Sequence, residues 1–503
     1  MFFKILLFLI LLVSPALSVS LEGAIQHALG NNKNIIIQEA ELESSLGAIK
    51  EFQSIYDPSL NIELSYIDST IPSTSAFAKN NVISEDLTYT DLGIEGYLPT
   101  GTHYTLFNAE LNKTKTDLGT SAISPKWETD LEFSVRQNLL KDFGPEVNNS
   151  KIIIAKRNAE ISKIELERVI SSTILEIETK YWNAVYAKKN LKLAESSLHL
   201  AEDLVEKNRV EVEVGSLPKI ALLQAQSEVA FRTVKFIKAE NAYHTSLDSL
   251  KMSLSIPFSQ RITVNDDIEQ KMLKRIDENE LESIVLNNRP EIRQESMQLE
   301  NSKQLVEYYS NQLLPDFDIE ASLSYAGLGG SKNPDYSSSI LGSPKIANKY
   351  DEGFSDSMDT LRSLENKTWS IGARLSIPLG NNAAEGKYET AIARKNQRLI
   401  LLDQLLDSIN LEARSSYREV MSNAKKIESS KLNLSLQEEV LNIEEERFKI
   451  GMATMRDVLE AQRDLINAQV QYNKALADYN VSITALDYSL GLLVKEKKIV
   501  LDN

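Results

Sequence analysis

The chain has 503 residues, with 72 acidic and 55 basic side chains, a formal charge of -17 and no cysteine. The acidic balance argues against nucleic acid as a partner, because phosphate binding needs a basic surface. The absence of cysteine excludes disulfide bonds, thiolate metal sites and cysteine nucleophiles. With only 19 glycines and 13 prolines, the chain has few tight turns, so its secondary-structure elements must be long.

The N-terminus has the pattern of a secretory signal peptide, which we assign to residues 1–18. A basic residue, Lys4, precedes an unbroken apolar run at residues 5–13, and small residues end at Ser18, after which we expect cleavage. The apolar run is short for a membrane anchor, which needs about 20 apolar residues. No later stretch of the sequence reaches that length, so any insertion into a membrane is expected to use β-strands.

The remaining sequence contains an internal duplication. The region around Pro58 resembles the region around Pro315, and Val-Gly-Ser at 214–216 matches Ile-Gly-Met at 450–452. Each copy reads as helix, strand, loop, strand, long helix, turn and helix. The predicted boundaries are 19–257 for the first copy, 258–277 for a linker, 278–492 for the second copy and 493–503 for a C-terminal tail.

Two segments, 146–214 and 387–450, are predicted to be long helices, because they contain no glycine or proline and their apolar residues recur at intervals of three and four. At 1.5 Å per residue, about 65 residues make a rod of roughly 100 Å. Such a rod must pack sideways against other helices. Shorter helices, two of which match one rod in length, are expected at 21–55, 218–253, 279–313 and 453–490. Each chain is thus expected to present four helical columns.

Alternating apolar and polar residues predict β-strands at 130–136, 318–325 and 369–377. The pattern is typical of transmembrane barrels, and a soluble β-sandwich also shows it. With two strands in each copy, four strands per chain cannot close a barrel, so the barrel interpretation requires an oligomer. The polar segment 326–367 is expected to be a long extracellular loop. A further hairpin is expected at about 87–112, and its place inside or outside the barrel is left open.

The most specific motif lies near the C-terminus. Residues 447–469, beginning Arg-Phe-Lys-Ile-Gly-Met-Ala-Thr-Met-Arg-Asp-Val-Leu-Glu-Ala-Gln, closely resemble the signature of the TolC-like outer-membrane efflux family, the outer membrane factors. Tyr479, the run at 485–491 and the strand starts at Pro58 and Pro315 are also similar to that family. The resemblance covers essentially the whole mature chain, in both copies.

The resemblance implies a mainly α fold with a transmembrane β part. Four strands per chain would form a trimeric twelve-stranded β-barrel, continuous with a twelve-helix periplasmic α-barrel. It implies a place in the cell outer membrane, in contact with outer-membrane lipid, with a large periplasmic part. The implied function is the exit duct of a tripartite efflux pump or type I secretion system, which exports solutes or polypeptides passively. The implied partners are a periplasmic adaptor (membrane fusion protein) and an inner-membrane transporter.

Asp457 and Glu460 are the candidate channel residues. They lie three residues apart on one helix face, just after a predicted turn. Thr454 followed by Asp457 also has the spacing of a capping box, and an acid in a first turn suits the helix dipole, so from the residues alone a structural role is favoured. The resemblance implies instead an acidic constriction ring at the periplasmic entrance. The equivalent positions in the first copy, Ala221 and Gln224, carry no charge.

Two predicted turns join the long helices to the helices that follow them. Glycine in a left-handed conformation commonly ends a helix, and this explains both glycines. The resemblance implies in addition that the turns dock onto the helical hairpin of the adaptor. The residues concerned are Val214, Gly215, Ser216, Ile450, Gly451 and Met452.

The sequence contains no catalytic constellation, metal site or cofactor-binding motif, and we predict that the protein is not an enzyme. The 4 histidines are scattered without the spacing of metal ligands. Residues 327–330 are glycine-rich but lack the lysine and the following helix of a phosphate-binding loop. Two other classes fit less well: a periplasmic adaptor-like coiled-coil protein, which would have a single hairpin and a lipoyl-like domain, and a secreted hydrolase, which would need a compact catalytic segment.

Overall fold

The computed structural model of the chain describes residues 17–272, 277–343 and 350–497. Residues 1–16, most of the predicted signal peptide, lie outside the described residues, and cleavage after Ser18 stays a prediction. None of the described helices is both long and apolar enough to cross a membrane. The chain divides into two compact units, a helical unit (Met1–Ser44, Glu160–Met297 and Ile400–Asn503) and a sheet unit (Ser45–Ala159 and Gln298–Leu399).

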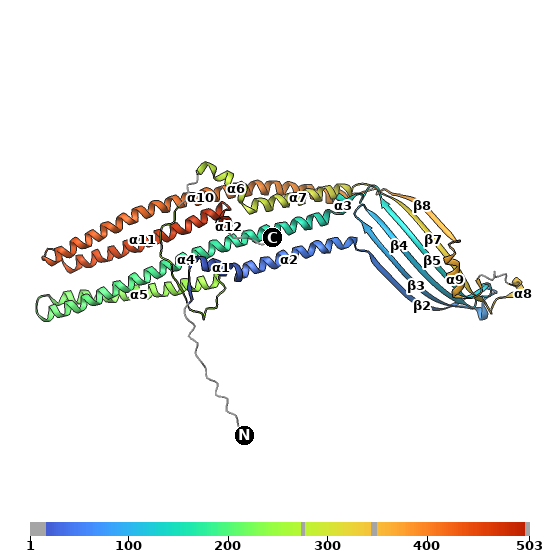
Figure 1. Cartoon of the computed structure of the whole chain (residues 1–503), viewed down its shortest axis with the longest axis horizontal. Helices are drawn as coiled ribbons and strands as arrows, with labels where there is room; N and C mark the ends of the chain where they lie inside the picture. Colours follow the sequence, from blue (N-terminus) through green and yellow to red (C-terminus); the bar gives the residue numbers. More distant parts are fainter. Residues whose placement is uncertain (1–16, 273–276, 344–349, 498–503) are drawn as a thin grey trace, which may run out of the picture. The chain divides into compact units, whose positions relative to one another are not determined.

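The sheet unit contains one six-stranded sheet in the order β2-β3-β4-β5-β7-β8 (Figure 1). Each strand pairs antiparallel with its neighbours in this order, so the chain passes back and forth across the sheet without a crossover. The strands are β2 (Ser59–Pro72), β3 (Val82–Leu98), β4 (Thr102–Thr116), β5 (Ile123–Asn138), β7 (Asp316–Lys332) and β8 (Lys367–Ser376).

The sheet has two strands more than the four that the sequence assigns to the barrel. The four expected strands are present as β2, β5, β7 and β8, and the hairpin expected at about 87–112 forms β3 and β4 in the middle of the sheet. The correction from four strands per chain to six has a local cause. The pairing register shifts between Ile94 and Glu95 in β3 and between Thr105 and Asn108 in β4. Such shifts interrupt the alternation by which strands are recognised in a sequence.

The segment 326–367, expected to be a polar loop, contains regular secondary structure. β7 continues into it, and a short helix, α9 (Phe354–Arg362), packs on β5 and β7. The hydroxyls of Thr129 and Ser357 lie 2.9 Å apart at this contact. A Cβ at Gly327 would lie 2.1 Å from the Ser357 carbonyl oxygen. The glycine-rich motif is therefore explained by close packing of a helix on a strand.

Two helical hairpins carry the long helices, and their bounds confirm the predicted rods (Figure 1). The scarcity of glycine and proline lets each long helix run without a break, and apolar residues at helical spacing give it a face to bury. The hairpins are α4 (Ser150–Glu213) with α5 (Lys219–Ser253), and α10 (Asn382–Lys449) with α11 (Met455–Ser489). The shortest helices include α3 (Pro145–Asn148) and α8 (Ser338–Leu341).

The predicted helices at 21–55 and 279–313 are each broken, at equivalent positions. Both break residues are buried, and their side chains cap the end of another helix. The Asn32 amide donates to the Ser253 carbonyl at 2.8 Å, and the Arg289 guanidinium donates to the Ser489 carbonyl at 3.1 Å. The four resulting helices are α1 (Leu21–Asn31), α2 (Lys33–Gln53), α6 (Leu281–Asn288) and α7 (Pro290–Asn311).

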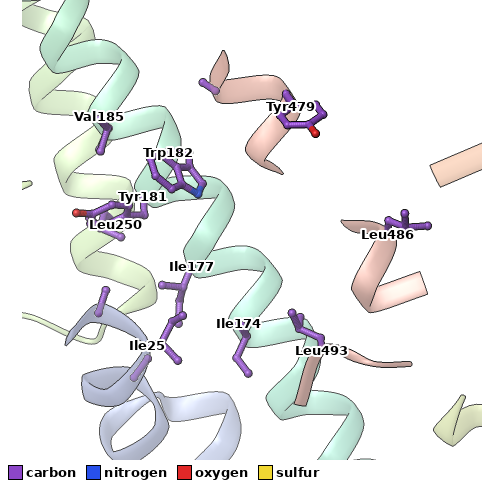
Figure 2. Close-up of a cluster of buried hydrophobic side chains, with 14 of the residues drawn as sticks. Ile25, Ile174, Ile177, Tyr181, Trp182, Val185, Leu250, Tyr479, Leu486 and Leu493 are labelled. Carbon is purple, nitrogen blue, oxygen red and sulfur yellow. The ribbon is translucent and has the colours of Figure 1, made fainter. Parts of the chain in front are cut away.

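A cluster of buried apolar side chains forms the core of the helical unit (Figure 2). Ile174, Ile177 and Tyr181 lie at three- and four-residue spacing on α4, and all three are almost fully buried. Leu250 of α5 and Leu486 of α11 belong to the same cluster. Further members come from the parallel strand pair β1 (Leu17–Val19) and β6 (Ile262–Val264) and from α12 (Leu493–Glu496).

Candidate channel and docking residues

The two hairpin turns share one backbone conformation, which depends on glycine. Gly215 and Gly451 both have a φ of 77°, in the left-handed region that favours glycine. In each turn the glycine N–H bonds to the carbonyl three residues back, and the next N–H bonds to the carbonyl five residues back. This Schellman pattern satisfies the last carbonyls of α4 and α10 within the turn itself. The turns therefore need no other part of the chain to hold their shape.

Large apolar side chains are exposed at these turns. Val214 is 73% exposed, Ile450 70% and Met452 69%. Ser216 acts within its own turn, since its hydroxyl donates to the Glu211 carbonyl at 2.9 Å. Exposed apolar groups gathered at the end of a hairpin are the kind of surface that binds another protein. Three of the predicted docking residues, Val214, Ile450 and Met452, are thus accessible to a partner.

Asp457 forms the capping box that its spacing predicts. Its carboxylate accepts from the Thr454 backbone N–H at 2.8 Å and from the Thr454 hydroxyl at 2.7 Å, and the Asp457 N–H donates back to that hydroxyl at 3.3 Å. These two bonds from Thr454 lower the pKa of the Asp457 carboxyl. The residue is exposed, and so is Glu460 one helical turn further on. The Asp457 carboxylate is therefore charged at neutral pH, and both acids reach solvent.

A buried ion pair next to this acidic pair joins the two hairpins, and the sequence did not reveal it. Glu228 and Arg232 of α5 have side chains that are only 2% and 4% exposed. The Arg232 Nε donates to Glu228 at 2.8 Å, and a second arginine, Arg463 of α11, also binds the Glu228 carboxylate. The remaining Arg232 donors reach the Ser197 carbonyl of α4 at 2.8 Å and the Gln462 amide oxygen at 2.9 Å. Glu228 and the arginine that it binds on its own helix thus connect three helices.

The electrostatics of this group favour its charged form. Burial alone raises the pKa of the Glu228 carboxyl, but hydrogen bonds from Arg463 and Arg232 outweigh burial and lower it. The only signal in the sequence is a Glu and an Arg four residues apart on a helix. That spacing usually marks an exposed pair, so the sequence could not distinguish this one.

A second buried carboxylate fixes the linker between the predicted copies. The Glu178 side chain of α4 is 0% exposed and lies 2.9 Å from the Lys271 ammonium. It also accepts from the Thr484 hydroxyl at 2.6 Å and pairs with Lys497 near the end of α12. Buried Asn480 of α11 adds two contacts to the same linker. Lys271 of the linker and Lys497 are therefore both attached to α4.

Over much of the sheet, apolar side chains lie on one face and polar side chains on the other, with exceptions such as Asp86 of β3, and we name the two faces the apolar face and the acidic face. On the apolar face, cross-strand neighbours run Ile62, Leu92, Ala109, Leu131 and Tyr325, across β2, β3, β4, β5 and β7. Many side chains on this face are open to the surroundings: Leu64 is 72% exposed, and Trp369 and Ile371 are 70% exposed. An apolar surface of this extent is unusual for a protein in water.

The acidic face carries a row of carboxylates. Cross-strand neighbours in this row are Glu63, Asp91, Glu110 and Asp130. Like charges directly opposite one another destabilise a sheet, and burying them would raise that cost further. This face is therefore suited to water, and the opposite face is suited to an apolar medium.

Within the described ranges, no group of three or more His, Cys, Asp or Glu residues could hold a metal ion. The candidate residues thus form two sets: the helical unit holds the turns, the acidic pair and the buried ion pairs, and the sheet unit holds the two-faced sheet.

Comparison with known proteins gives one family and one fold. The model of a family described as outer membrane efflux protein matches residues 106–255 and 281–492. No curated protein sequence matches the chain.

Several solved structures share the fold. The Campylobacter jejuni CmeC outer membrane channel is 16% identical, with a TM-score of 0.67 over 96% of this chain and 90% of that one. The Vibrio cholerae outer membrane protein VceC is 16% identical, with a TM-score of 0.65 over 94% of this chain and 96% of that one. The open state of the Neisseria gonorrhoeae MtrE outer membrane channel is 14% identical, with a TM-score of 0.65 over 94% and 89%.

Proposed function

Because this chain belongs to the outer membrane efflux protein family, we propose that it is the exit duct of a tripartite efflux pump or of a type I secretion system. Solutes or polypeptides pass through it without any energy input from this chain. A periplasmic adaptor and an inner-membrane transporter are the partners that such a duct requires. The chain functions as a homotrimer in the cell outer membrane, with a large periplasmic part.

The single observation that carries the proposal is the two-faced sheet. Its apolar face is exposed in one chain and matches the hydrocarbon of a bilayer. Its acidic face requires water, and a closed barrel provides water on the inside only. One chain has too few strands to enclose a pore, so several copies must contribute to one barrel.

At the periplasmic entrance of the duct, Asp457 and Glu460 form a ring of carboxylates. The exposed turns of the helical hairpins dock onto the adaptor. The capping bonds of Asp457 and the ring are compatible, since the capped carboxylate stays charged and exposed. Symmetry places such a pair from each copy around one opening, where the carboxylates attract and hold cations.

Planar bilayer recordings test the ring. Replacing Asp457 and Glu460 together by Ala should weaken the block of conductance by divalent cations by about tenfold or more, because the charge that holds the cation is gone. Gln224→Ala, at the uncharged equivalent position in the other turn, is the matched control and should leave the block unchanged. A block of normal strength in the double variant would refute the ring and leave the channel proposal standing.

Fractionation tests the function itself. The full-length protein, expressed in a Gram-negative cell, should be recovered from the outer membrane as a detergent-stable trimer that conducts ions in planar bilayers. Recovery as a soluble periplasmic monomer would refute the exit-duct proposal and would favour an adaptor-like protein. Co-purification with an adaptor, and its loss when Val214, Ile450 and Met452 are replaced by Ser, tests the docking surface.

A further inference from the structure

We propose that three copies of this chain close a barrel of eighteen strands, in which β2 of one copy pairs with β8 of the next. Each copy supplies six strands, and three times six is eighteen. The hairpin β3–β4 is thus part of the barrel wall and widens the pore. The inference rests on the trimeric channel proposed above. It adds the width of the pore and the pair of strands through which neighbouring copies make contact.

The hairpin is paired on both sides over most of its length. β3 pairs with β2 from Val82 to Glu95, and β4 pairs with β5 from Thr102 to Thr114, with one register shift. β2 and β5 do not pair with each other, because the hairpin lies between them. An appendage outside a barrel would leave β2 and β5 as neighbours. The order of the strands therefore places the hairpin in the wall.

The hairpin also keeps the two faces of the sheet. Leu92 of β3 and Ala109 of β4 continue the apolar row between Ile62 and Leu131, and Asp91 and Glu110 continue the acidic row. A hairpin lying in water beyond the barrel would have no reason to hold apolar and acidic side chains in register with its neighbours. The lipid-facing and water-facing surfaces are continuous only with the hairpin included.

The turn of the hairpin is fixed to the segment that leads into α4. The Asn148 amide donates to the Pro99 carbonyl at 3.1 Å, and the Tyr97 hydroxyl donates to the Asn148 side-chain oxygen at 2.7 Å. Gly101 passes so close to this segment that a Cβ there would lie 2.3 Å from the Asp142 carbonyl oxygen. The turn is therefore positioned by specific contacts at the end of the sheet where β5 continues toward α4.

The two edge strands are suited to each other. Six consecutive antiparallel strands leave β2 and β8 running in opposite directions, so β2 of a second copy can extend the sheet at β8 with antiparallel pairing. Every residue of β8 is exposed in one chain, and an open edge of this kind readily pairs with another strand. Leu64 of β2 and Ile371 of β8 lie on the same apolar face. Closure by this pairing therefore keeps the faces continuous around the barrel.

The added strands change the calibre of the pore. With a strand spacing of about 4.8 Å and a tilt of about 40°, eighteen strands give a backbone radius of about 18 Å, against about 12 Å for twelve strands. The cross-section therefore increases roughly twofold. Cargo in the barrel is limited by this radius, so the duct accommodates solutes or polypeptide segments about 1.5 times wider than a twelve-stranded barrel does.

Electron cryomicroscopy of the intact trimer in lipid nanodiscs tests the proposal directly. End-on views should show eighteen strands and a backbone radius of about 18 Å. A matched variant lacks residues 82–116, with Asn81 joined to Asp117. The two loops that this deletion joins already meet in the intact protein, since the Gly119 N–H donates to the Phe77 carbonyl at 3.0 Å. This variant should form a trimeric barrel of twelve strands with a radius about 1.5-fold smaller.

Engineered cysteines test the contact between copies, even if the deletion variant fails to fold. The chain has no cysteine of its own, so every disulfide reports on the introduced pair. Leu64→Cys combined in turn with Trp369→Cys, Ile371→Cys or Ala373→Cys should give covalent dimers and trimers on oxidation for at least one pair. Leu92→Cys with Ile371→Cys, on an interior and an edge strand, should give none.

The outcomes separate this inference from the proposed function. A trimer with twelve strands and the hairpin outside the wall, or a dimer of twelve strands, would overturn the eighteen-stranded barrel. The first of these leaves the trimeric exit duct intact. A protein absent from the outer membrane would overturn both. Eighteen strands with crosslinks between β2 and β8 would support both.

Discussion

Glu228 is the side chain on which the two helical hairpins depend. Its buried carboxylate binds two guanidinium groups, the buried Arg232 and the half-exposed Arg463, and Arg232 also donates to a carbonyl of α4. The desolvation of such a group is costly, and the pair stabilises the fold only while every member keeps its partners. Removal of the carboxylate alone leaves a buried guanidinium without its counter-charge. The effect of a single substitution here is therefore large.

Glu228→Gln should lower the free energy of unfolding by about 3 kcal/mol. Denaturant titration of the detergent-solubilised protein, followed by circular dichroism, measures this loss. Glu240→Gln, at an exposed position on the same helix, is the matched control and should change stability by less than about 0.5 kcal/mol. Equal effects of the two substitutions would show that the buried network contributes nothing beyond an exposed charge.

Glu178 gives the helical unit a dependence on pH. Burial raises the pKa of its carboxyl, but the charges of Lys271 and Lys497 and the bonds from Lys497 and Thr484 outweigh burial, so the pKa lies below the ordinary 4.5. A carboxyl with a lower pKa in the folded protein stabilises the fold above pH 4.5, and this contribution is lost as the pH falls through the lowered pKa.

Glu178→Gln should therefore reduce stability at neutral pH and flatten the fall in stability below pH 4.5. Unfolding free energies of the two proteins across this range give the comparison, and their difference isolates this one group. Glu195→Gln, an exposed acid on α4, should keep the full pH dependence. A variant curve parallel to that of the natural protein would mean that Glu178 does not titrate with folding.

At the scale of single elements, the turns show how glycine has opposite effects in two settings. Gly451 has a φ of 77° at the end of α10, whereas Gly386 lies inside the same helix with open space around it. Alanine is strained at the first position and favoured at the second.

Gly451→Ala should destabilise the protein by about 1 kcal/mol, and Gly386→Ala should stabilise it by roughly 0.5–1 kcal/mol. Thermal unfolding of both variants in the same detergent measures whether each substitution raises or lowers the stability of the protein. Two shifts of the same sign would contradict the assignment of the turn. The turn variant should also bind the adaptor less well, because its exposed side chains move with the backbone.

The long helices could be predicted from the sequence more completely than the strands of the sheet, for physical reasons. A long helix needs only the scarcity of glycine and proline and a regular apolar spacing, so the bounds of α4 and α11 follow closely. The break at Arg289 has a signal in Pro290, since the residue before proline avoids helical geometry, but the break at Asn32 has none. β4 carries one extra residue relative to both of its neighbours, which reverses the faces along that strand, and a two-residue pattern does not follow such a reversal. The partners of Glu228 lie on other helices, and no local pattern encodes them.

At the scale of the whole molecule, the acidic face determines which ions the duct prefers. If that face lines a barrel of several copies, the row of carboxylates repeats around the pore and gives it a negative potential. Such a lining attracts cations and excludes anions, most strongly at low ionic strength.

Asp91→Asn combined with Glu110→Gln should lower the cation-to-anion permeability ratio at least about twofold, because half of the row in each copy loses its charge. Reversal potentials measured across a salt gradient give this ratio. Asp86→Asn removes a charge from the opposite face of β3 and should leave the ratio unchanged. If the double variant and the Asp86→Asn variant have the same permeability ratio, the acidic face does not line the conducting path.

The position of the β3–β4 hairpin also bears on how such ducts can diversify. A hairpin adds strands two at a time, so the polarity of the sheet edges is preserved and the contact between copies needs no redesign. An insertion of one strand would reverse an edge, so the contact between copies would have to change from antiparallel to parallel pairing. The circumference of the barrel therefore changes in steps of one hairpin. A hairpin begins and ends at the same end of the sheet, so selection can add or remove it without moving the strands on either side. The connections from α2 into β2 and from β5 into α4 are left as they are.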